Sequence, residues 1–495
     1  MRMSHGGVDI GSASTPRSPF YDRGRFGRLF PTLPPFAQDT KRVRQALSEL
    51  GAKGGPMDAS RPNPDGTPGA RNIDNPTITA GFTFLGQFLD HDMTFDPTSS
   101  LARRQDPESI RNFRIPALDL DSVYGGGPDI SPHLYDRTVD RGRTTLLVEK
   151  IPGSAAVSMD GNARFDLPRN RQNMALAGDA RNDENLVVSQ LHLAVLRFHN
   201  RVVADVREDL SAGSTAEEVF AEASRIVRWH YQWLVLHEFL PRTVGSATAE
   251  DVLINDLRHY RWRHEPFIPV EFSVAAYRFG HSQIRPTYRA NFGPSADHPE
   301  RQFFAQIFSP ASPDSKDPPD LRGSKRAARR FIDWQTFFDF GDGLVFQNKR
   351  IDTVLSSPLF DLMGMAEGQP TSLATRDLLR GLVLKLPSGQ RVAQTMQLPV
   401  LAPADLEDLE PFALRDRTPL WFYVLREAEI TTNGDHLGPV GGRIVAEVIA
   451  GLVKGDRQSY FRQDPAWLPT YGLEGRFTVV DLLRAAGVVA TLPPL

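Results

Sequence analysis

The chain has 495 residues, of which 40% are hydrophobic and 24% charged, and its formal net charge is −3. These values are typical of a globular protein and lack the basic excess of a nucleic-acid binder, so we expect no nucleic-acid partner. The sequence contains no cysteine, which excludes disulfides, thiolate nucleophiles and thiolate metal ligands and leaves histidine and the carboxylates to bind any metal.

The N-terminal residues contain no apolar stretch as long as that of a secretory signal peptide. No later segment offers the ~18 consecutive apolar residues of a membrane span. From these features we expect a cytoplasmic protein, or one that is secreted by a route independent of a signal peptide.

Residues 1–75 are rich in Gly, Pro and Arg, and they end in a run, 61–69, that cannot continue a helix or a central strand. We expect this N-terminal arm to wrap over a core. The remaining residues, 76–490, are expected to form a single helical domain.

Apolar residues recur at helical spacing in several segments, which are 80–90, 186–206, 219–239 and 443–454. Gly455 follows the last of these at the place where a helix C-cap is expected. Loops rich in Pro and Asp, such as 309–320, separate the helices. No alternating run is long enough to support a large sheet, so the sequence predicts a mainly α fold with very little β-structure.

The first candidate site lies in the segment 86–95. On a helix Gln87 is three residues from Asp90 and four from His91, so the three side chains share one face, while Asp92 is turned away by about 100°. This geometry allows two sites back to back. The alternative is a solvated cluster of charged residues at a helix end.

The second candidate, the segment 178–185, leads into the long apolar helix. Asn182 or Asp183 is expected to be the N-cap, and Arg181 and Glu184 are three apart, close enough to address one ligand. In the alternative reading, the acidic residues only complement the helix dipole and Arg181 is a surface residue.

Two further segments carry candidate ligands. His281 follows an aromatic-Gly pair inside an apolar stretch, but no spacing rule links it to His91. Asp119 and Asp121 form a carboxylate pair in a turn-prone loop, where oxygen ligands suit a hard cation such as calcium and a solvated turn is equally consistent. The residues by themselves therefore indicate a site of His, Asp and Glu side chains and no more.

Taken in order, these segments resemble the animal haem peroxidase family, or peroxidase-cyclooxygenase superfamily, and its bacterial-like members in particular. The similarity runs from about residue 72 to residue 484. In that family a Gln-x-x-Asp-His-Asp helix lies over the distal face of haem b, and a catalytic arginine precedes a haem-linking glutamate by three residues. The matching positions here are Gln87, Asp90, His91, Asp92, Arg181 and Glu184.

The proximal histidine of the family follows an Arg-aromatic-Gly pattern, which implies that His281 is the haem iron ligand and that Arg278 belongs to the cofactor site. Its hydrogen-bonding partner, usually Asn, corresponds to Asp377, and an arginine that contacts a haem propionate corresponds to Arg380. A carboxylate behind the ligand makes the imidazole more anionic than an amide does, so we expect a lower reduction potential and a milder oxidant.

The resemblance also implies covalent and metal sites. Asp90 and Glu184 match the positions that form ester links to the haem in mammalian members, whereas Asn185 replaces the methionine of the strongest halide oxidant, so chloride oxidation is not expected. The calcium site of the family, with Ile115 here in place of a Thr ligand, corresponds to Asp92, Ala117, Asp119 and Asp121.

The implied activity is that of a haem peroxidase. His91 would transfer the proton of hydrogen peroxide as acid-base catalyst, Arg181 would supply positive charge where negative charge develops, and Gln87 would hold water or a small anion. The reducing substrate would be bromide, iodide, thiocyanate or an aromatic donor. The sequence leaves the physiological donor and the oligomeric state open.

Other functions must be weighed against this one. In fatty-acid dioxygenases of the same superfamily a catalytic tyrosine lies three residues before the proximal histidine; here Arg278 holds that place, and Tyr277 is one residue off and turned by about 100° on a helix. The His91-Asp92 pair also resembles HD-type phosphohydrolases, although a two-residue motif has little specificity. A non-enzymatic role in adhesion is the third alternative.

Overall fold

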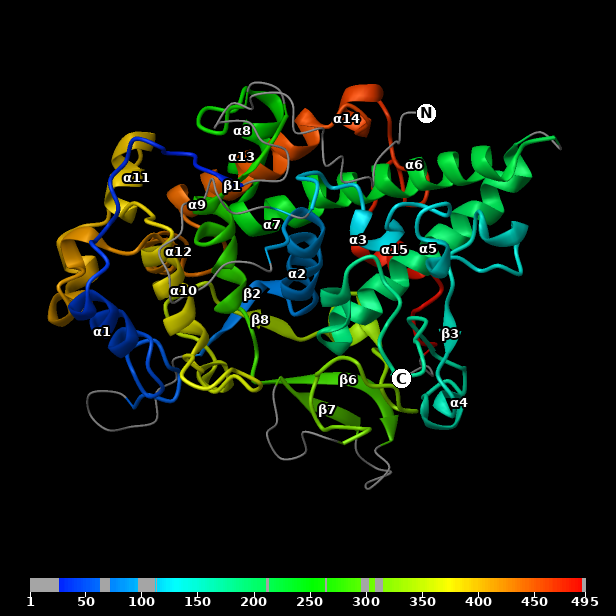
Figure 1. Cartoon of the computed structure of the whole chain (residues 1–495), viewed down its shortest axis with the longest axis horizontal. Helices are drawn as coiled ribbons and strands as arrows, with labels where there is room; N and C mark the ends of the chain where they lie inside the picture. The colour runs from blue at the N-terminus through cyan, green and yellow to red at the C-terminus, as the bar shows by residue number, and fades with distance from the viewer. Residues whose placement is uncertain are drawn as a thin grey trace.

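The computed structural model describes residues 26–62, 72–96, 112, 114–210, 213–262, 265–294, 302–307 and 315–491. It is 46% helix and 8% strand, which confirms the prediction of a mainly α fold (Figure 1). The helices are α1 (Lys41–Leu50), α2 (Gly81–Met93), α3 (Asp121–Tyr124), α4 (Ser154–Val157), α5 (Leu186–Asp209), α6 (Ala216–Leu234), α7 (Leu240–Val244), α8 (Ser246–Ile254), α9 (Val270–Ser273), α10 (Leu373–Val383), α11 (Gly389–Met396), α12 (Leu420–Thr432), α13 (Pro439–Gly455), α14 (Tyr460–Gln463) and α15 (Val479–Ala485).

The strands pair two by two. Among the described strand pairs, only β1 (Phe26–Gly27) and β5 (Ile268–Pro269) are parallel. The antiparallel pairs are β2 (Asp74–Thr79) with β8 (Gln347–Lys349), β3 (Glu149–Lys150) with β4 (Phe165–Asp166), and β6 (Thr287–Pro294) with β7 (Gln302–Gln306). Two-stranded ribbons cannot enclose a core, so the described residues are organised by helix packing.

Helix α2 lies in the middle of the molecule, with α5 and α6 on one side and α10 and α12 on the other (Figure 1). Its phenylalanines and leucines are buried around most of its circumference, as in a helix enclosed by others. The helix begins one residue after the predicted start and continues to Met93, one turn beyond the predicted end. Asp90, His91 and Asp92 are therefore all held in its last helical turn.

Helix α5 begins at Leu186, the predicted start, but its N-cap is not one of the two predicted residues. Its N-cap is Asn185, whose side chain accepts a hydrogen bond from the backbone N–H of Val188. The two residues expected in this role, Asn182 and Asp183, lie instead in the 3₁₀ helix η4 (Ala180–Asp183). Their side chains have other partners, since Asn182 contacts two histidines and Asp183 binds Arg169, and so they are not free to cap α5.

The helical segment that begins with α6 extends beyond the predicted segment 219–239 at both ends. It starts at a capping box formed by Thr215 and Glu218 and passes through a π-helical turn, Val235–Phe239, into α7. Pro241, near the start of α7, has no N–H to donate, and such breaks in the hydrogen-bond ladder accompany a change of helix type. At the C-terminal end, α13 includes the predicted segment 443–454, and its C-cap is Asp456, one residue after the predicted Gly455.

Part of the predicted N-terminal arm is described. Strand β1 pairs with β5, and α1 packs against α10 with Leu47 and Leu50 fully buried. Residues 26–62 thus contribute to the hydrophobic core on the side of α10. Residues 1–25 and 63–71, and the first half of the predicted loop 309–320, lie outside the described residues, and the boundary between arm and domain stays a prediction.

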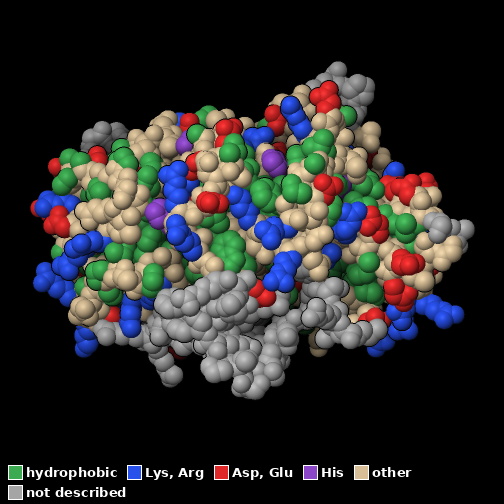
Figure 2. Space-filling view, turned by 90° about the horizontal axis from the view of Figure 1, so that it is seen from above, with side chains coloured by type: hydrophobic (Ala, Val, Ile, Leu, Met, Phe, Trp, Pro, Cys, Tyr) green, Lys and Arg blue, Asp and Glu red, His purple; other side chains and the backbone are tan. Residues whose placement is uncertain are grey.

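On the face shown in Figure 2, lysine and arginine side chains alternate with acidic and apolar ones and are spread over its whole width. Among the described helices, none is both long and apolar enough to cross a membrane.

Candidate active site

A cavity of about 850 Å³ lies along α2. Its wall is built from segments that are far apart in the sequence: the face of α2, the residues around η4, the 3₁₀ helix η6 (Ala276–His281), and residues 359–373. The predicted site residues on this wall are Gln87, Asp90, His91, Arg181, Glu184, Arg278 and His281.

His91 is 4% exposed, and its two ring nitrogens have different surroundings. Nδ1 lies 2.9 Å from the side-chain oxygen of Asn182, and Nε2 lies 3.6 Å from a carboxylate oxygen of Glu184. Burial, and then the positive charge of Arg181, lower the pKa of His91. The imidazole is therefore neutral near pH 7, and because Nδ1 donates to an oxygen, Nε2 carries the free lone pair.

The other polar groups beside His91 are hydrogen bonded to one another. The Gln87 amide donates to Glu184, and the Asn185 amide donates to the side-chain oxygen of Gln87 at 3.0 Å. The Glu184 side chain is 45% exposed within the cavity, yet protein surrounds it, and this burial raises its pKa to about 7 against the opposing charge of Arg181.

Arg181 is held in place by Asp179. Its Nη2 donates to one carboxylate oxygen of Asp179 at 2.8 Å and to the backbone carbonyl of His91 at 3.0 Å. Asp179 also binds the guanidinium of Arg114 and caps η4 by accepting the backbone N–H of Arg181. A fixed positive charge thus lies beside the neutral imidazole of His91.

His281 has an anionic partner. Its Nδ1 donates to Asp377 at 2.6 Å, and Arg278 binds the other oxygen of the same carboxylate. Asp377, on α10, is fully buried; burial alone would raise its pKa, but His281 and Arg278 together outweigh it and hold the pKa below its usual value. With Nδ1 engaged, Nε2 of His281 is left for a ligand in the cavity.

On the opposite face of α2, three predicted calcium ligands converge. Asp92, Asp119 and Asp121 are buried, and each offers a carboxylate oxygen within 4.8 Å of the others. Asp92 accepts hydrogen bonds from the Leu120 backbone and from the Ser122 hydroxyl at 3.1 and 3.0 Å. Burial and then the charge of Asp119 raise the pKa of Asp92 to about 7.

The loop before this acidic cluster is tightly held. Ala117 is buried in it and has only backbone oxygen to offer a cation, and Ile115 has no side-chain oxygen. Leu120 adopts the left-handed conformation, with φ 61°, which is strained for a branched side chain. Gln232 of α6 donates to the carbonyl of Leu118 at 3.1 Å and Arg114 lies 3.2 Å from Asp121, so the cluster joins α2, the loop and α6.

Part of the chain is similar to a known protein family. The family model for animal haem peroxidases matches residues 105–323, a segment that includes Arg181, Glu184 and His281. This segment of the chain belongs to the animal haem peroxidase family. Human thyroid peroxidase is 28% identical over 236 residues, which are 45% of this chain and 24% of that protein. The peroxidasin homolog pxn-2 of Caenorhabditis elegans is 27% identical over 192 residues, 38% of this chain and 14% of the relative.

These animal haem peroxidases are much longer than the region that they share with this chain. The shared region covers about a quarter of human thyroid peroxidase. Solved structures cover more of the fold. Peroxidase A from Dictyostelium discoideum superposes with a TM-score of 0.64 at 17% identity over 95% of both chains. The fatty acid alpha-dioxygenase of Oryza sativa gives 0.61 at 15% identity over 95% of this chain and 80% of that one. The helical fold is therefore common to both kinds of protein.

The residues of this haem peroxidase family member fit a haem. A second pocket of about 140 Å³ shares Asp90, Arg181 and Arg278 with the large cavity and adds Arg380. Arg380 binds Asp96 at 3.1 Å, while its Nε is buried with no hydrogen-bond partner among the described residues. The guanidinium groups of Arg278 and Arg380 suit the two carboxylates of a haem, because arginine pairs with carboxylates through parallel hydrogen bonds.

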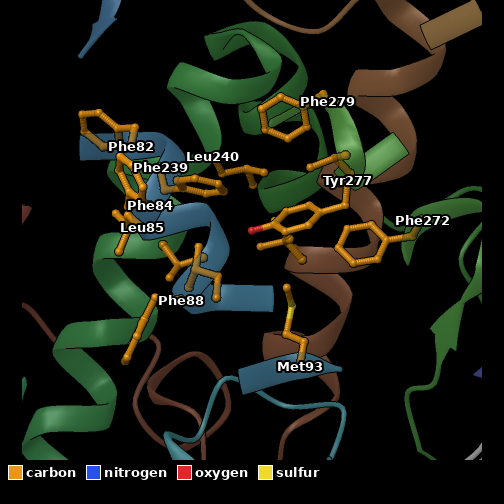
Figure 3. Close-up of a cluster of buried hydrophobic side chains, with 14 of the residues drawn as sticks. Phe82, Phe84, Leu85, Phe88, Met93, Phe239, Leu240, Phe272, Tyr277 and Phe279 are labelled. Carbon is orange, nitrogen blue, oxygen red and sulfur yellow. The ribbon is translucent and has the colours of Figure 1, made fainter. Parts of the chain in front are cut away.

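Tyr277 also reaches the cavity, contrary to the expectation that it is turned away. The segment before His281 is a 3₁₀ helix and not an α-helix, so the rotation expected of an α-helix does not apply. The phenol packs among Phe239, Phe272 and Phe279 (Figure 3), and its hydroxyl donates to the carbonyl of Gly86 at 3.0 Å. Tyr277 thereby connects the segment of His281 to the helix of His91.

The structure separates the His91-Asp92 pair that resembles an HD phosphohydrolase motif. The His91 ring lies on the cavity wall and bonds to Asn182, whereas the Asp92 carboxylate lies in the acidic cluster with Asp119. The two side chains therefore do not bind one metal together, as that motif requires.

Several site residues were missed in the sequence. Asp179 orients Arg181, and His192 on α5 bonds to Asn182, the partner of His91. Asp179 could have been found from the sequence, because an Asp two residues before an Arg at a helix start is typical of an N-cap. His192 carries no local signal, because only the crossing of α2 and α5 brings it near the site.

Proposed function

We propose that the protein is a haem-dependent peroxidase, which reduces hydrogen peroxide and oxidises a small reducing substrate. The observation that carries this function is the contrast between two histidines on one cavity. His281 is hydrogen bonded to the carboxylate of Asp377, which increases its strength as an iron ligand, whereas His91 is hydrogen bonded to a neutral amide and keeps a free Nε2 as a base.

His281 would hold the haem iron through Nε2, and Arg278 and Arg380 would bind the haem propionates. When bound, haem supplies the redox chemistry of the reaction, the two-electron reduction of peroxide and the subsequent oxidation of the donor. The carboxylate of Asp377 makes His281 more electron-donating than an Asn does, which favours a mild oxidant.

His91 would transfer protons. As a neutral imidazole, its Nε2 would take a proton from hydrogen peroxide, and the imidazolium so formed would return that proton to the departing oxygen. Arg181 places its positive charge where negative charge develops as the O–O bond breaks, without a cost of reorganisation because Asp179 already fixes the guanidinium. Gln87 orients water or a small anion beside them.

Further features of the site belong to the same proposal. Asp90 and Glu184 would form ester links to the haem, since both carboxylates face the cavity. Bromide, iodide, thiocyanate and aromatic molecules are the proposed donors. Asp92, Asp119, Asp121 and the backbone of Ala117 would bind a calcium ion, whose charge offsets the repulsion among the buried carboxylates.

The test is an absorption titration of the full-length protein with haem, followed by mixing with hydrogen peroxide. We expect a Soret band at one haem per chain and a rapid change of this band on addition of peroxide. The His281→Gln variant should lose the band of the bound haem, while His237→Gln, a control at an exposed histidine bonded to Tyr460, should keep it. Unchanged haem binding by His281→Gln would refute the assignment.

One observation favours a second function. The Tyr277 phenol lies on the same cavity wall as His281, and the fold also matches a fatty acid alpha-dioxygenase, so fatty-acid oxygenation is the second candidate. It predicts oxygen uptake with a fatty acid that Tyr277→Phe abolishes. If oxygen uptake is absent while peroxide reacts rapidly, this second function is excluded.

A further inference from the structure

A chain of three buried side chains runs from the cavity into the protein. Asn182 places its amide oxygen 2.9 Å from Nδ1 of His91 and its amide nitrogen 2.9 Å from Nδ1 of His192. Asn182 is fully buried and His192 is 1% exposed. The three residues come from α2, η4 and α5, so the tertiary structure brings them together.

The amide determines which nitrogen of each ring carries a proton. An amide oxygen only accepts hydrogen bonds and an amide NH₂ only donates them. Nδ1 of His91 must therefore carry a hydrogen, and Nδ1 of His192 must be without one. If the amide were reversed, its NH₂ would donate to Nδ1 of His91 and the ring proton would lie on Nε2. Nε2 could then no longer accept a proton from peroxide.

From this geometry we propose that Asn182 and His192 are positioning residues that hold His91 in the tautomer whose Nε2 is unprotonated. The inference rests on the proposed function in so far as His91 is the proton-transfer group. With its Nδ1 unprotonated, His192 accepts from the amide NH₂ and so favours the orientation in which the Asn182 oxygen accepts from Nδ1 of His91.

The surroundings of His192 support this role. Its ring packs edge-on against Phe88 of α2, with centroids 6.2 Å apart. Burial lowers the pKa of His192 to about 4, so the ring is neutral at pH 7 and its Nδ1 is available as an acceptor. A charged ring would present an N–H to the amide NH₂, and the hydrogen bond would be lost.

Asn182 has no capping function that would explain its burial. The side chain of Asn185 caps α5, and that of Asp179 caps η4. The side-chain hydrogen bonds recorded for Asn182 go to His91 and His192. Because a buried amide is costly unless it is satisfied at both ends, the two histidines account for its presence.

The first measurement is the tautomer itself, from ¹⁵N NMR of the full-length protein labelled in histidine and kept in a diamagnetic state. His91→Gln and His192→Gln spectra assign the two rings. We expect the proton of His91 on Nδ1 and that of His192 on Nε2. In Asn182→Asp, whose side chain only accepts, His91 should keep its tautomer while His192 moves its proton to Nδ1.

The second measurement is the rate constant for the reaction of the haem-loaded protein with peroxide. Asn182→Leu should lower it about 10²-fold or more, within the range of general acid-base catalysis, with the Soret band of bound haem retained. Asn182→Asp keeps an acceptor for Nδ1 of His91, so it should lose less of the rate than Asn182→Leu. His192→Leu should lower the rate and His192→Asn, which offers an acceptor oxygen, should recover it.

The matched control is His199→Asn. His199 is also a fully buried histidine of α5, but it bonds to Tyr124 and to the carbonyl of Thr144, away from the cavity. It should lower stability and leave the peroxide reaction unchanged. Equal rate losses in His192→Leu and His199→Asn would show a merely structural role.

The two proposals fail in different ways. A proton on Nε2 of His91 in the unmutated protein overturns the positioning role, even if the protein reacts rapidly with peroxide. Absence of a peroxide reaction together with the expected tautomers overturns the proposed function and leaves the hydrogen-bond chain established. If His91 loses its Nδ1-protonated tautomer in Asn182→Leu, this result supports the positioning role whether or not the protein reacts with peroxide.

Discussion

Asp377 and Asn182 occupy equivalent positions behind the two histidines of the cavity and differ in charge. The carboxylate of Asp377 is fully buried, which is costly for a lone charge, but His281 and Arg278 bind both of its oxygens. The amide of Asn182 carries no charge and leaves His91 a neutral base. The chemistry of each imidazole is thus set by the residue behind it.

The Asp377→Asn variant tests the charge at this position. An amide oxygen still accepts from Nδ1 of His281, but the imidazole becomes less anionic, so the midpoint potential of the haem should rise by tens of millivolts. Spectroelectrochemical titration measures this shift. Asp377→Leu, which removes the acceptor altogether, should instead weaken haem binding; equal potentials for Asp377→Asn and the unmutated protein would contradict the prediction.

Arg181 is the second residue whose effect is separable from haem binding. Arg181→Ala removes the positive charge beside His91, and we expect the rate constant for peroxide to fall by about 10²-fold while the Soret band persists. Stopped-flow absorption measures it. The control is Arg171→Ala, at an exposed arginine of the loop before η4, which should react at the unmutated rate.

At the scale of elements, helix ends are stabilised by side chains from other elements. Glu427 of α12 is 1% exposed and accepts the backbone N–H groups of Val440 and Gly441 in the first turn of α13. Proximity to a helix N-terminus favours the carboxylate form, but burial dominates and raises the pKa of Glu427 to about 7. The contact therefore depends on pH.

This raised pKa gives stability a defined pH dependence. In the unfolded chain the carboxyl group loses its proton near pH 4.3, whereas in the folded protein it keeps the proton to about pH 7. The stability contributed by the protonated form is fully present below pH 4.3 and is lost as pH rises through 7. We expect Glu427→Gln, compared with the unmutated protein by urea unfolding at pH 5 and pH 8, to lose less stability over this interval; an identical pH dependence would contradict the assignment.

At the scale of the whole molecule, the acidic cluster of Asp92, Asp119 and Asp121 connects segments of the chain that carry or support residues of the cavity. Asp92 belongs to the helix of His91, and Asp119 and Asp121 lie in the loop that Gln232 ties to α6. Arg114 joins Asp121 to Asp179, the residue that orients Arg181. A cation in the cluster would therefore stabilise the fold and both sides of the cavity.

Calcium should accordingly raise the melting temperature of the protein. A ligand present at 100 times its Kd stabilises the folded state by about 2.7 kcal/mol, and a chelator removes this contribution. Differential scanning calorimetry with calcium and with chelator measures the shift, which we expect to be a few degrees. Asp119→Asn should reduce the shift, whereas Asp129→Asn, at an exposed residue paired with Arg143, should retain it.

The sequence by itself determined the mainly α fold and the helix or loop in which each candidate side chain lies. Helical periodicity located α2, α5, α6 and α13, because the buried face of a helix requires apolar residues at helical spacing along the sequence. The spacing of Gln87, Asp90 and His91 placed them on one face of α2. Resemblance to a family, and not any spacing rule, paired His91 with His281.

The resemblance implied that Asp377 is the partner of His281, and the packing of η6 against α10 forms this contact. Only the tertiary structure decided the partner of His91, which reaches His192 through Asn182, a residue that the sequence suggested as a helix cap. Local propensity assigns a polar residue to the nearest helix end, whereas a buried amide goes where both its donor and its acceptor are satisfied. The packing of α2 against η4 and α5 supplies that place, and no stretch of sequence contains it.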